Sequence, residues 1–199
     1  MGDDLREPAV PPDPPMAPSS ARPLLLIDVD GPLNRFAGGH RGAYRAGYRK
    51  YRMGQGHHLM LHPGHGRRLA ALPFDLVWAT TWEHEADQWI APLLGLPPLP
   101  VIEWPDGAPT YGRVHFKTPT VVDFASGRPF AWVDDEVTDE DRRFVAEHHA
   151  GPALLHHVDP AVGLADDDFA ALAEWAGRLG APGTGHDDGP RAGGVARGG

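Results

Sequence analysis

The 199-residue sequence contains no cysteine, which excludes structural disulfides and thiolate metal sites. It also lacks any apolar run close to the ~20 residues that a helix needs to cross a bilayer. Residues 1–20 contain no apolar segment of the kind found in signal peptides. From these absences we expect a cytoplasmic protein without membrane contact.

Acidic residues are missing from one long segment, although the net charge of the whole chain is −9. The acidic total argues against non-specific binding to nucleic acid. Residues 31–74 nevertheless contain no Asp or Glu. Their cationic residues are Arg35, Arg41, Arg45, Arg49, Lys50, Arg52, Arg67 and Arg68. This local reversal of charge predicts an attraction for anions.

Composition divides the chain into a folded centre and two tails. Residues 1–22 are rich in proline and residues 181–199 are rich in glycine, and neither stretch has enough apolar residues to offset the entropy of ordering. We therefore expect two disordered tails around one folded domain, residues 23–180.

Short apolar runs alternate with helical patterns inside this domain. The runs show no polar alternation, which is typical of parallel strands buried on both faces. The expected strands are residues 23–28, 74–80, 99–102, 129–134 and 153–158. This order predicts a Rossmann-like α/β fold, with a doubly wound, mainly parallel five-stranded sheet covered by helices on both faces.

Helix signals lie between the expected strands. Pro63 is expected to open a helix that runs to Ala71, and residues 83–94 have a helical pattern that Pro92 disturbs. Thr118 is expected to be an N-cap, followed by Pro119 at the first helical position. Residues 138–141 resemble a capping box, and residues 166–179 carry an apolar stripe.

Polar residues follow three of the expected strands. Asp28 and Asp30 follow the first, Thr80 and Thr81 the second, and Asp134 and Asp135 the fourth, while Lys117 begins the helix before the fourth. Ligands of such sheets bind at the carboxyl ends of the strands, so these residues are expected to converge.

This set of side chains suits phosphoryl transfer. One carboxylate attacks phosphorus, a second acid protonates the leaving oxygen and later activates water, and a hard cation neutralises charge. A lysine and a hydroxyl would hold the remaining charge of the phosphoryl group. Magnesium prefers carboxylate oxygens, which Asp28 together with Asp134 or Asp135 would supply.

The chain resembles the haloacid dehalogenase-like hydrolase superfamily in four segments that occur in the family's order. They are LLLIDVDG (24–31), LVWATTW (76–82), FKTPTVVDFA (116–125) and FAWVDDE (130–136). The resemblance covers roughly residues 24–160 and implies a small-cap, phosphatase-like member that uses Mg²⁺.

The resemblance also implies roles for individual residues. Asp28 would be the nucleophile and a metal ligand, and Asp30 the acid/base residue whose backbone carbonyl also binds the metal. Thr80, or Thr81 in its place, would bind the phosphoryl group, and Lys117 would stabilise it. Asp134 and Asp135 would complete the magnesium site.

The sequence departs from the family pattern at Pro32, where Thr or Val is usual. Pro32 has no backbone N–H and stiffens the turn after the Asp pair. Two alternatives to a phosphatase of small molecules stay open. Pro32 favours a catalytically weak binding module on the same fold, whereas a basic insert over an open site favours a nucleic-acid end-processing phosphatase.

Residues 35–73 lie where the family carries a cap, and they are too short for a large one. We expect a small basic flap over a fairly open site, with Arg45 and Arg49 binding the substrate. Interleaved tyrosines, Tyr44, Tyr48 and Tyr51, would suit stacking of a base. The expected partner is a phosphorylated small molecule or a nucleotide, and an ordinary solvated basic surface is the alternative.

Overall fold

The computed structural model describes residues 22–53, 58–107 and 111–180. Its main sheet has four parallel strands in the order β4-β1-β5-β6. These strands are β1 (Leu24–Ile27), β4 (Asp75–Trp78), β5 (Phe130–Asp134) and β6 (Ala153–His157). The predicted tails lie outside the described residues, apart from Arg22.

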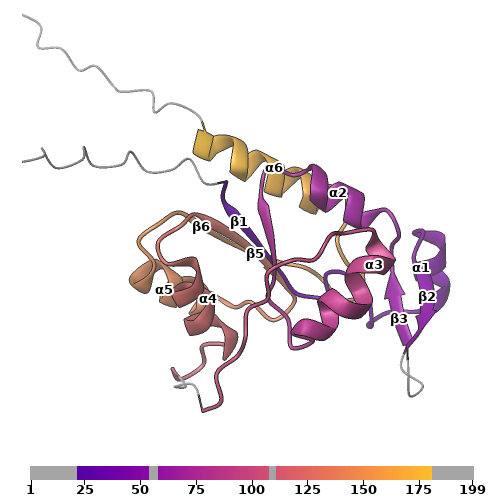
Figure 1. Cartoon of the computed structure of the whole chain (residues 1–199), viewed down its shortest axis with the longest axis horizontal. Helices are drawn as coiled ribbons and strands as arrows, with labels where there is room; N and C mark the ends of the chain where they lie inside the picture. Colours follow the sequence, from indigo (N-terminus) through magenta and orange to yellow (C-terminus); the bar gives the residue numbers. More distant parts are fainter. Residues whose placement is uncertain (1–21, 54–57, 108–110, 181–199) are drawn as a thin grey trace, which may run out of the picture.

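Helices cover both faces of this sheet, as Figure 1 shows. One face packs against α2 (His65–Ala71), the π-helix η2 (Ala86–Ile90), α3 (Ala91–Leu94) and α6 (Asp166–Gly180). The other face packs against α4 (Lys117–Ala125) and α5 (Asp139–His148). The α/β architecture with helices on both faces is therefore confirmed.

The central strand β1 shows why apolar runs form this sheet. All four of its residues are buried. Successive side chains of a strand point to opposite faces, so Leu25 and Ile27 enter the core under α2 and α6, while Leu24 and Leu26 enter the core under α4 and α5. Two hydrophobic faces require an apolar residue at every position, which explains the unbroken run.

The prediction of a full fifth strand at residues 99–102 is wrong. Only one parallel bridge forms there, between Trp78 and Val101. The backbone N–H of Trp78 bonds to the carbonyl of Pro100 at 2.8 Å, and Ile102 N–H bonds back to Trp78 at 2.9 Å. Pro98 and Pro100 have no N–H to donate, so the pairing cannot extend along this segment.

Two of the helix predictions depend on which residue caps the helix. Thr138 caps α5 in a complete capping box with Asp141, as expected. The cap expected at Thr118 is wrong, because α4 begins at Lys117 and the Thr118 hydroxyl donates to Asp141 at 2.6 Å instead. The segment expected as one helix at residues 83–94 divides into η2 and α3.

Part of the acid-free segment forms a small flap, which we define as residues 35–53 and 58–62. It contains α1 (His40–Arg45) and an antiparallel hairpin of β2 (Arg49–Arg52) and β3 (His58–Leu61). Leu59 and Leu61 of β3 pack into the core under α2. The flap is also tied to the loop after β6, because Tyr48 Oη donates to the carbonyl of Val162 at 3.1 Å.

No helix in the described parts of the chain is long and apolar enough to span a membrane.

Candidate active site

The strand order reverses its direction between β1 and β5. From β1 the chain continues to β4 on one side, and from β5 it continues to β6 on the other. Adjacent parallel strands whose connections diverge leave an opening at their carboxyl ends. Asp28 follows β1, and Asp134 and Asp135 lie at the end of β5. The expected convergence of these carboxylates is therefore found.

These three carboxylates form a candidate metal centre. Each contributes an oxygen, and the three oxygens lie within 4.8 Å of one another. Asp28 and Asp134 are buried, and Asp135 is half-buried. Hard divalent cations such as Mg²⁺ prefer carboxylate oxygens.

Asp135 reaches the centre because residue 31 is a glycine. Gly31 has a φ of +85°, and an added Cβ would lie 2.5 Å from Cγ of Asp135. A side chain at position 31 would therefore displace this carboxylate. Burial and the neighbouring Asp134 both raise the pKa of Asp135.

Lys117, the first residue of α4, supplies the positive charge of the site. Its Nζ lies 2.9 Å from Oδ2 of Asp134 and 3.3 Å from Oδ1 of Asp28. The side chain is only 2% exposed, so it is not an ordinary surface lysine. Burial alone would lower its pKa, but the two carboxylates outweigh that effect and raise it.

Asp28 lies at the centre of this charge cluster. Burial raises its pKa to about 7, Asp134 adds to the increase, and Lys117 and a hydrogen bond with the Thr80 side chain oppose it. Three carboxylates around one ammonium leave an excess of negative charge. A divalent cation would neutralise that excess, so these residues could hold a metal ion.

Asp30 lies beside the cluster but is held by other partners. Its Oδ1 accepts from Asn34 Nδ2 at 2.6 Å, and its Oδ2 accepts from Trp82 Nε1 at 2.8 Å. Asn34 Oδ1 in turn accepts from the backbone N–H of Met60 in β3 at 2.8 Å. A single amide side chain thus connects the flap to Asp30.

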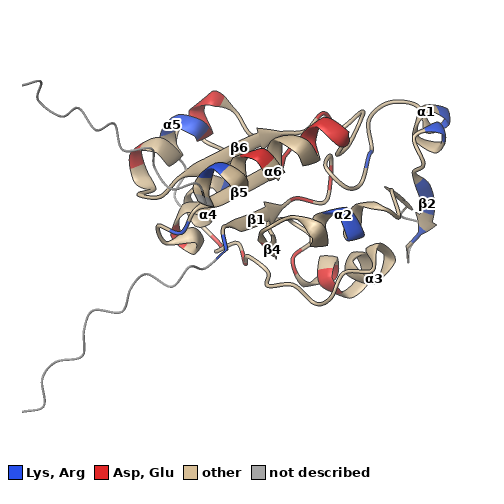
Figure 2. Cartoon of the chain, turned by 90° about the horizontal axis from the view of Figure 1, so that it is seen from above, with Lys and Arg blue, Asp and Glu red and all other residues tan. Residues whose placement is uncertain are grey.

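The other predicted site residues are placed differently. Thr80 is fully buried and bonded to Asp28, whereas Thr81 is exposed, so Thr80 is the hydroxyl that contacts the cluster. Arg45 and Arg49 are exposed on α1 and β2. Figure 2 shows these basic elements at one end of the molecule, without acidic residues.

The sequence did not predict that Asn34 and Trp82 would bind Asp30. Asn34 lies four residues after Asp30, and the tight turn between them brings the two side chains together. Trp82 comes from the segment after β4, and only the tertiary fold places its indole on Asp30. The only sequence signal for the Asn34 contact was that Asn34 lies four residues after Asp30.

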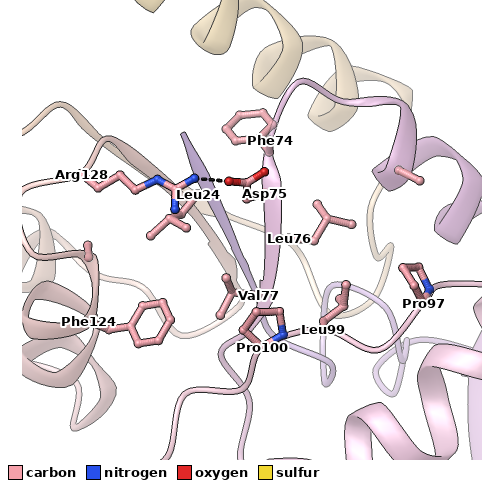
Figure 3. A pocket seen from close by; sticks show the side chains of 12 residues that line it. Leu24, Phe74, Asp75, Leu76, Val77, Pro97, Leu99, Pro100, Phe124 and Arg128 are labelled. Atoms are coloured by element: carbon pink, nitrogen blue, oxygen red, sulfur yellow. Dashed lines mark hydrogen bonds and ion pairs between the residues drawn. The ribbon is translucent and has the colours of Figure 1, made fainter. Parts of the chain in front are cut away.

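An apolar pocket of about 600 Å³ lies along β4 (Figure 3). Phe74, Leu76, Pro100 and Phe124 line it, together with Arg128 and Asp75, which form an ion pair. Asp75 opens β4, whereas Thr80 follows the end of that strand. This pocket is therefore distinct from the carboxylate cluster.

Comparison with known proteins gives no match: no family model, no curated protein and no solved structure is similar to this chain. The chemistry of the site therefore rests on its own geometry.

Proposed function

We propose that this protein is a magnesium-dependent phosphomonoester hydrolase that forms an aspartyl-phosphate on Asp28. The observation that carries this proposal is the buried cluster of Asp28, Asp134 and Asp135 around Lys117, at the opening between β1 and β5. A buried ammonium paired with two carboxylates has a high desolvation cost. That arrangement is unusual for a merely structural site and suits the handling of a doubly charged phosphate.

In the proposed first step, a carboxylate oxygen of Asp28 forms a bond to phosphorus while the ester oxygen leaves with its electron pair. Lys117 stabilises the negative charge on the transferring phosphoryl group. Thr80, which already bonds to Asp28, orients the nucleophile. Bound Mg²⁺, held by Asp28, Asp134 and Asp135, would supply further charge neutralisation.

Asp30 is the proposed acid and base. It donates a proton to the departing alkoxide, then takes a proton from the water that attacks phosphorus, which restores Asp28 and releases phosphate. Its hydrogen bonds from Asn34 and Trp82 fix the carboxyl orientation. We therefore regard these two as positioning residues.

The turn at Pro32 supports activity over a weak binding module. Both Leu33 and Asn34 donate their N–H groups to the carbonyl of Val29, and the Pro32 carbonyl accepts from Leu164 at 2.9 Å. Pro32 therefore lies in a turn whose backbone hydrogen bonds do not need an N–H group at residue 32. Asp30 keeps both of its side-chain hydrogen bonds.

A phosphatase that processes nucleic-acid ends is the second candidate. The exposed cations Arg45, Arg49 and Arg52, which lie on α1 and β2, favour it. Tyr48 is buried and so cannot stack on a base, whereas Tyr44 is 52% exposed. Hydrolysis of a 5′-phosphorylated oligonucleotide in preference to a nucleoside monophosphate would support this candidate.

The test of the proposed function is hydrolysis of para-nitrophenyl phosphate with Mg²⁺ and with EDTA. We expect magnesium-dependent release that falls at least about a thousandfold in Asp28→Asn. Asp123→Asn is the matched control, because it removes the same charge from an exposed position on α4. Undiminished turnover by Asp28→Asn would disprove the aspartyl-phosphate mechanism.

A further inference from the structure

A polar cavity of about 250 Å³ lies in the flap, and Asn34 is one of its lining residues. It is lined by the loop at residues 34–40, by α1 and by the hairpin. Four of its eleven lining residues are Arg, Lys or His, namely Arg35, His40, Lys50 and His58.

Two cations of this cavity, Arg35 and Lys50, form no ion pair within residues 22–53, 58–107 and 111–180. Residues 31–74 contain no Asp or Glu. The flap therefore gathers positive charge around a hollow, which costs free energy unless an anion offsets the repulsion.

Arg35 supplies an independent sign of a missing partner. Its Nε is buried and makes no hydrogen bond to the described residues. An added Cβ at Gly38 would lie 3.1 Å from Nη2 of Arg35, so the guanidinium extends along the cavity-lining loop. A buried donor of this kind is expensive to leave unsatisfied, since a charged group loses more than a neutral one.

We propose that this cavity binds a phosphate group, held by Arg35 and Lys50. The planar guanidinium donates paired hydrogen bonds to phosphate oxygens, and the lysine ammonium adds a point charge. His40 lines the same cavity and would add a donor. The volume is below the range of pockets that enclose drug-sized ligands, so it suits a single phosphate group.

The cavity is connected to Asp30 through Asn34. This residue lines the cavity, donates to Asp30 and accepts from Met60, which lines the cavity too. Binding of phosphate beside Asn34 would bias the position of Asp30. The phosphate group belongs either to free inorganic phosphate or to a second phosphoryl group of the substrate.

The first test measures binding without catalysis, so it does not depend on the proposed function. The full chain is titrated with inorganic phosphate and with pyrophosphate in EDTA at pH 7 by calorimetry. Without a divalent cation, the cluster of Asp28, Asp134 and Asp135 repels anions. The heat of phosphate binding then measures binding at the flap cavity. Arg35→Gln and Lys50→Gln are compared with Arg67→Gln, an exposed arginine of α2 outside the cavity.

We expect saturable binding to the wild type that weakens at least about tenfold in Arg35→Gln and in Lys50→Gln. Arg67→Gln should keep the wild-type affinity. Lys50 is exposed, so its replacement leaves the fold intact even where the Arg35 variant unfolds. No saturable binding to the wild type, or an equal loss in Arg67→Gln, would overturn the proposal.

The second test separates the two sources of phosphate. KM is compared for a substrate with one phosphate and for one with two, in wild type and in Lys50→Gln. A rise in KM confined to the substrate with two phosphates assigns the cavity to that substrate. An unchanged KM for both, together with calorimetric binding, assigns it to free phosphate.

Discussion

Asp28 has two requirements that conflict in the folded protein without a cation. In the proposed mechanism it must be ionised to act as the nucleophile, yet burial and Asp134 favour its protonated form. Lys117 compensates only in part, because it is shared with Asp134. A bound divalent cation would resolve the conflict, since it stabilises the ionised carboxylate.

The raised pKa of Asp28, about 7, predicts a pH-dependent stability in EDTA. Folded protein keeps this proton up to about pH 7, whereas the unfolded chain releases it near pH 4. The free energy of unfolding should therefore fall as pH rises through this window, by on the order of 2–4 kcal/mol. Asp28→Asn should remove that part of the slope.

Urea denaturation at pH 5, 6, 7 and 8 would measure the effect, with Asp123→Asn as the control for loss of a charge. Identical slopes in wild type and Asp28→Asn would contradict the assignment. Saturating Mg²⁺ should flatten the wild-type profile, because the ion holds Asp28 in its ionised form.

Gly31 and Gly127 form a matched pair for testing the position of Asp135. Both have a positive φ, +85° and +79°, but an added Cβ meets Asp135 at Gly31 and nothing within 4 Å at Gly127. Each substitution by Ala should cost about 1–2 kcal/mol of stability from backbone strain. Only Gly31→Ala should also weaken magnesium binding, by about tenfold or more, as judged by the Mg²⁺ dependence of hydrolysis. Equal Mg²⁺ dependence in both variants would rule out this role of Gly31.

At the scale of elements, Asp141 holds together the two helices that cover one face of the sheet. It accepts from the Thr118 hydroxyl in α4, from the His115 backbone at 2.7 Å and from the Thr138 backbone at 2.8 Å. Although burial opposes ionisation, these hydrogen bonds keep the pKa of Asp141 below its usual value. Asp141 thereby positions the start of α4, where Lys117 lies.

Asp141→Ala should lower the free energy of unfolding by about 3–5 kcal/mol, because it removes the Asp141 side chain from the capping box and leaves several buried donors unpaired. A depressed carboxyl pKa gives stability that is present above the unfolded value and is lost as pH falls toward the folded value. The difference from wild type should therefore shrink in acid. Glu140→Ala, on the same helix turn, should cost less than 1 kcal/mol by the same denaturation measurement. Similar losses in both variants would argue against a special role for Asp141.

The elements were predictable where one local signal decides the structure. Unbroken apolar runs identified β1, β4, β5 and β6, and the capping box identified α5. Prediction failed where tertiary partners decide. Thr118 has the residue type of a cap, but Asp141 takes its hydroxyl. Val101 lies beside Trp78, but the prolines around it limit the pairing to one bridge.

At the scale of the whole molecule, parallel strands bring residues 28, 80, 117, 134 and 135 together from four separate segments. Their convergence was predictable because parallel strands share one carboxyl edge. The bonds of Asp30 to Asn34 and Trp82 were not, because they depend on how the flap and the segment after β4 pack. Sequence order thus predicts the charged centre better than it predicts the residues that orient it.

Magnesium should stabilise the folded chain as a whole, because the three carboxylates come together only when the protein is folded. At a concentration of 100 times Kd, the gain in unfolding free energy is about 2.7 kcal/mol. Thermal denaturation with increasing Mg²⁺ would show this as a rising Tm. Asp135→Asn should reduce the shift, and Asp123→Asn should not. A Tm that does not respond to Mg²⁺ would contradict the metal centre.

The attachment of the flap has a consequence for the order of events in each turnover. Tyr48 bonds to Val162, and Ala37 bonds to Pro160, so both contacts tie the flap to the loop after β6. Opening the flap as a lid would break both contacts and pull on Asn34, which holds Asp30. In the proposed reaction, substrate entry and phosphate departure would then take place without a movement of the whole flap. The turnover number would accordingly not be limited by opening of the flap.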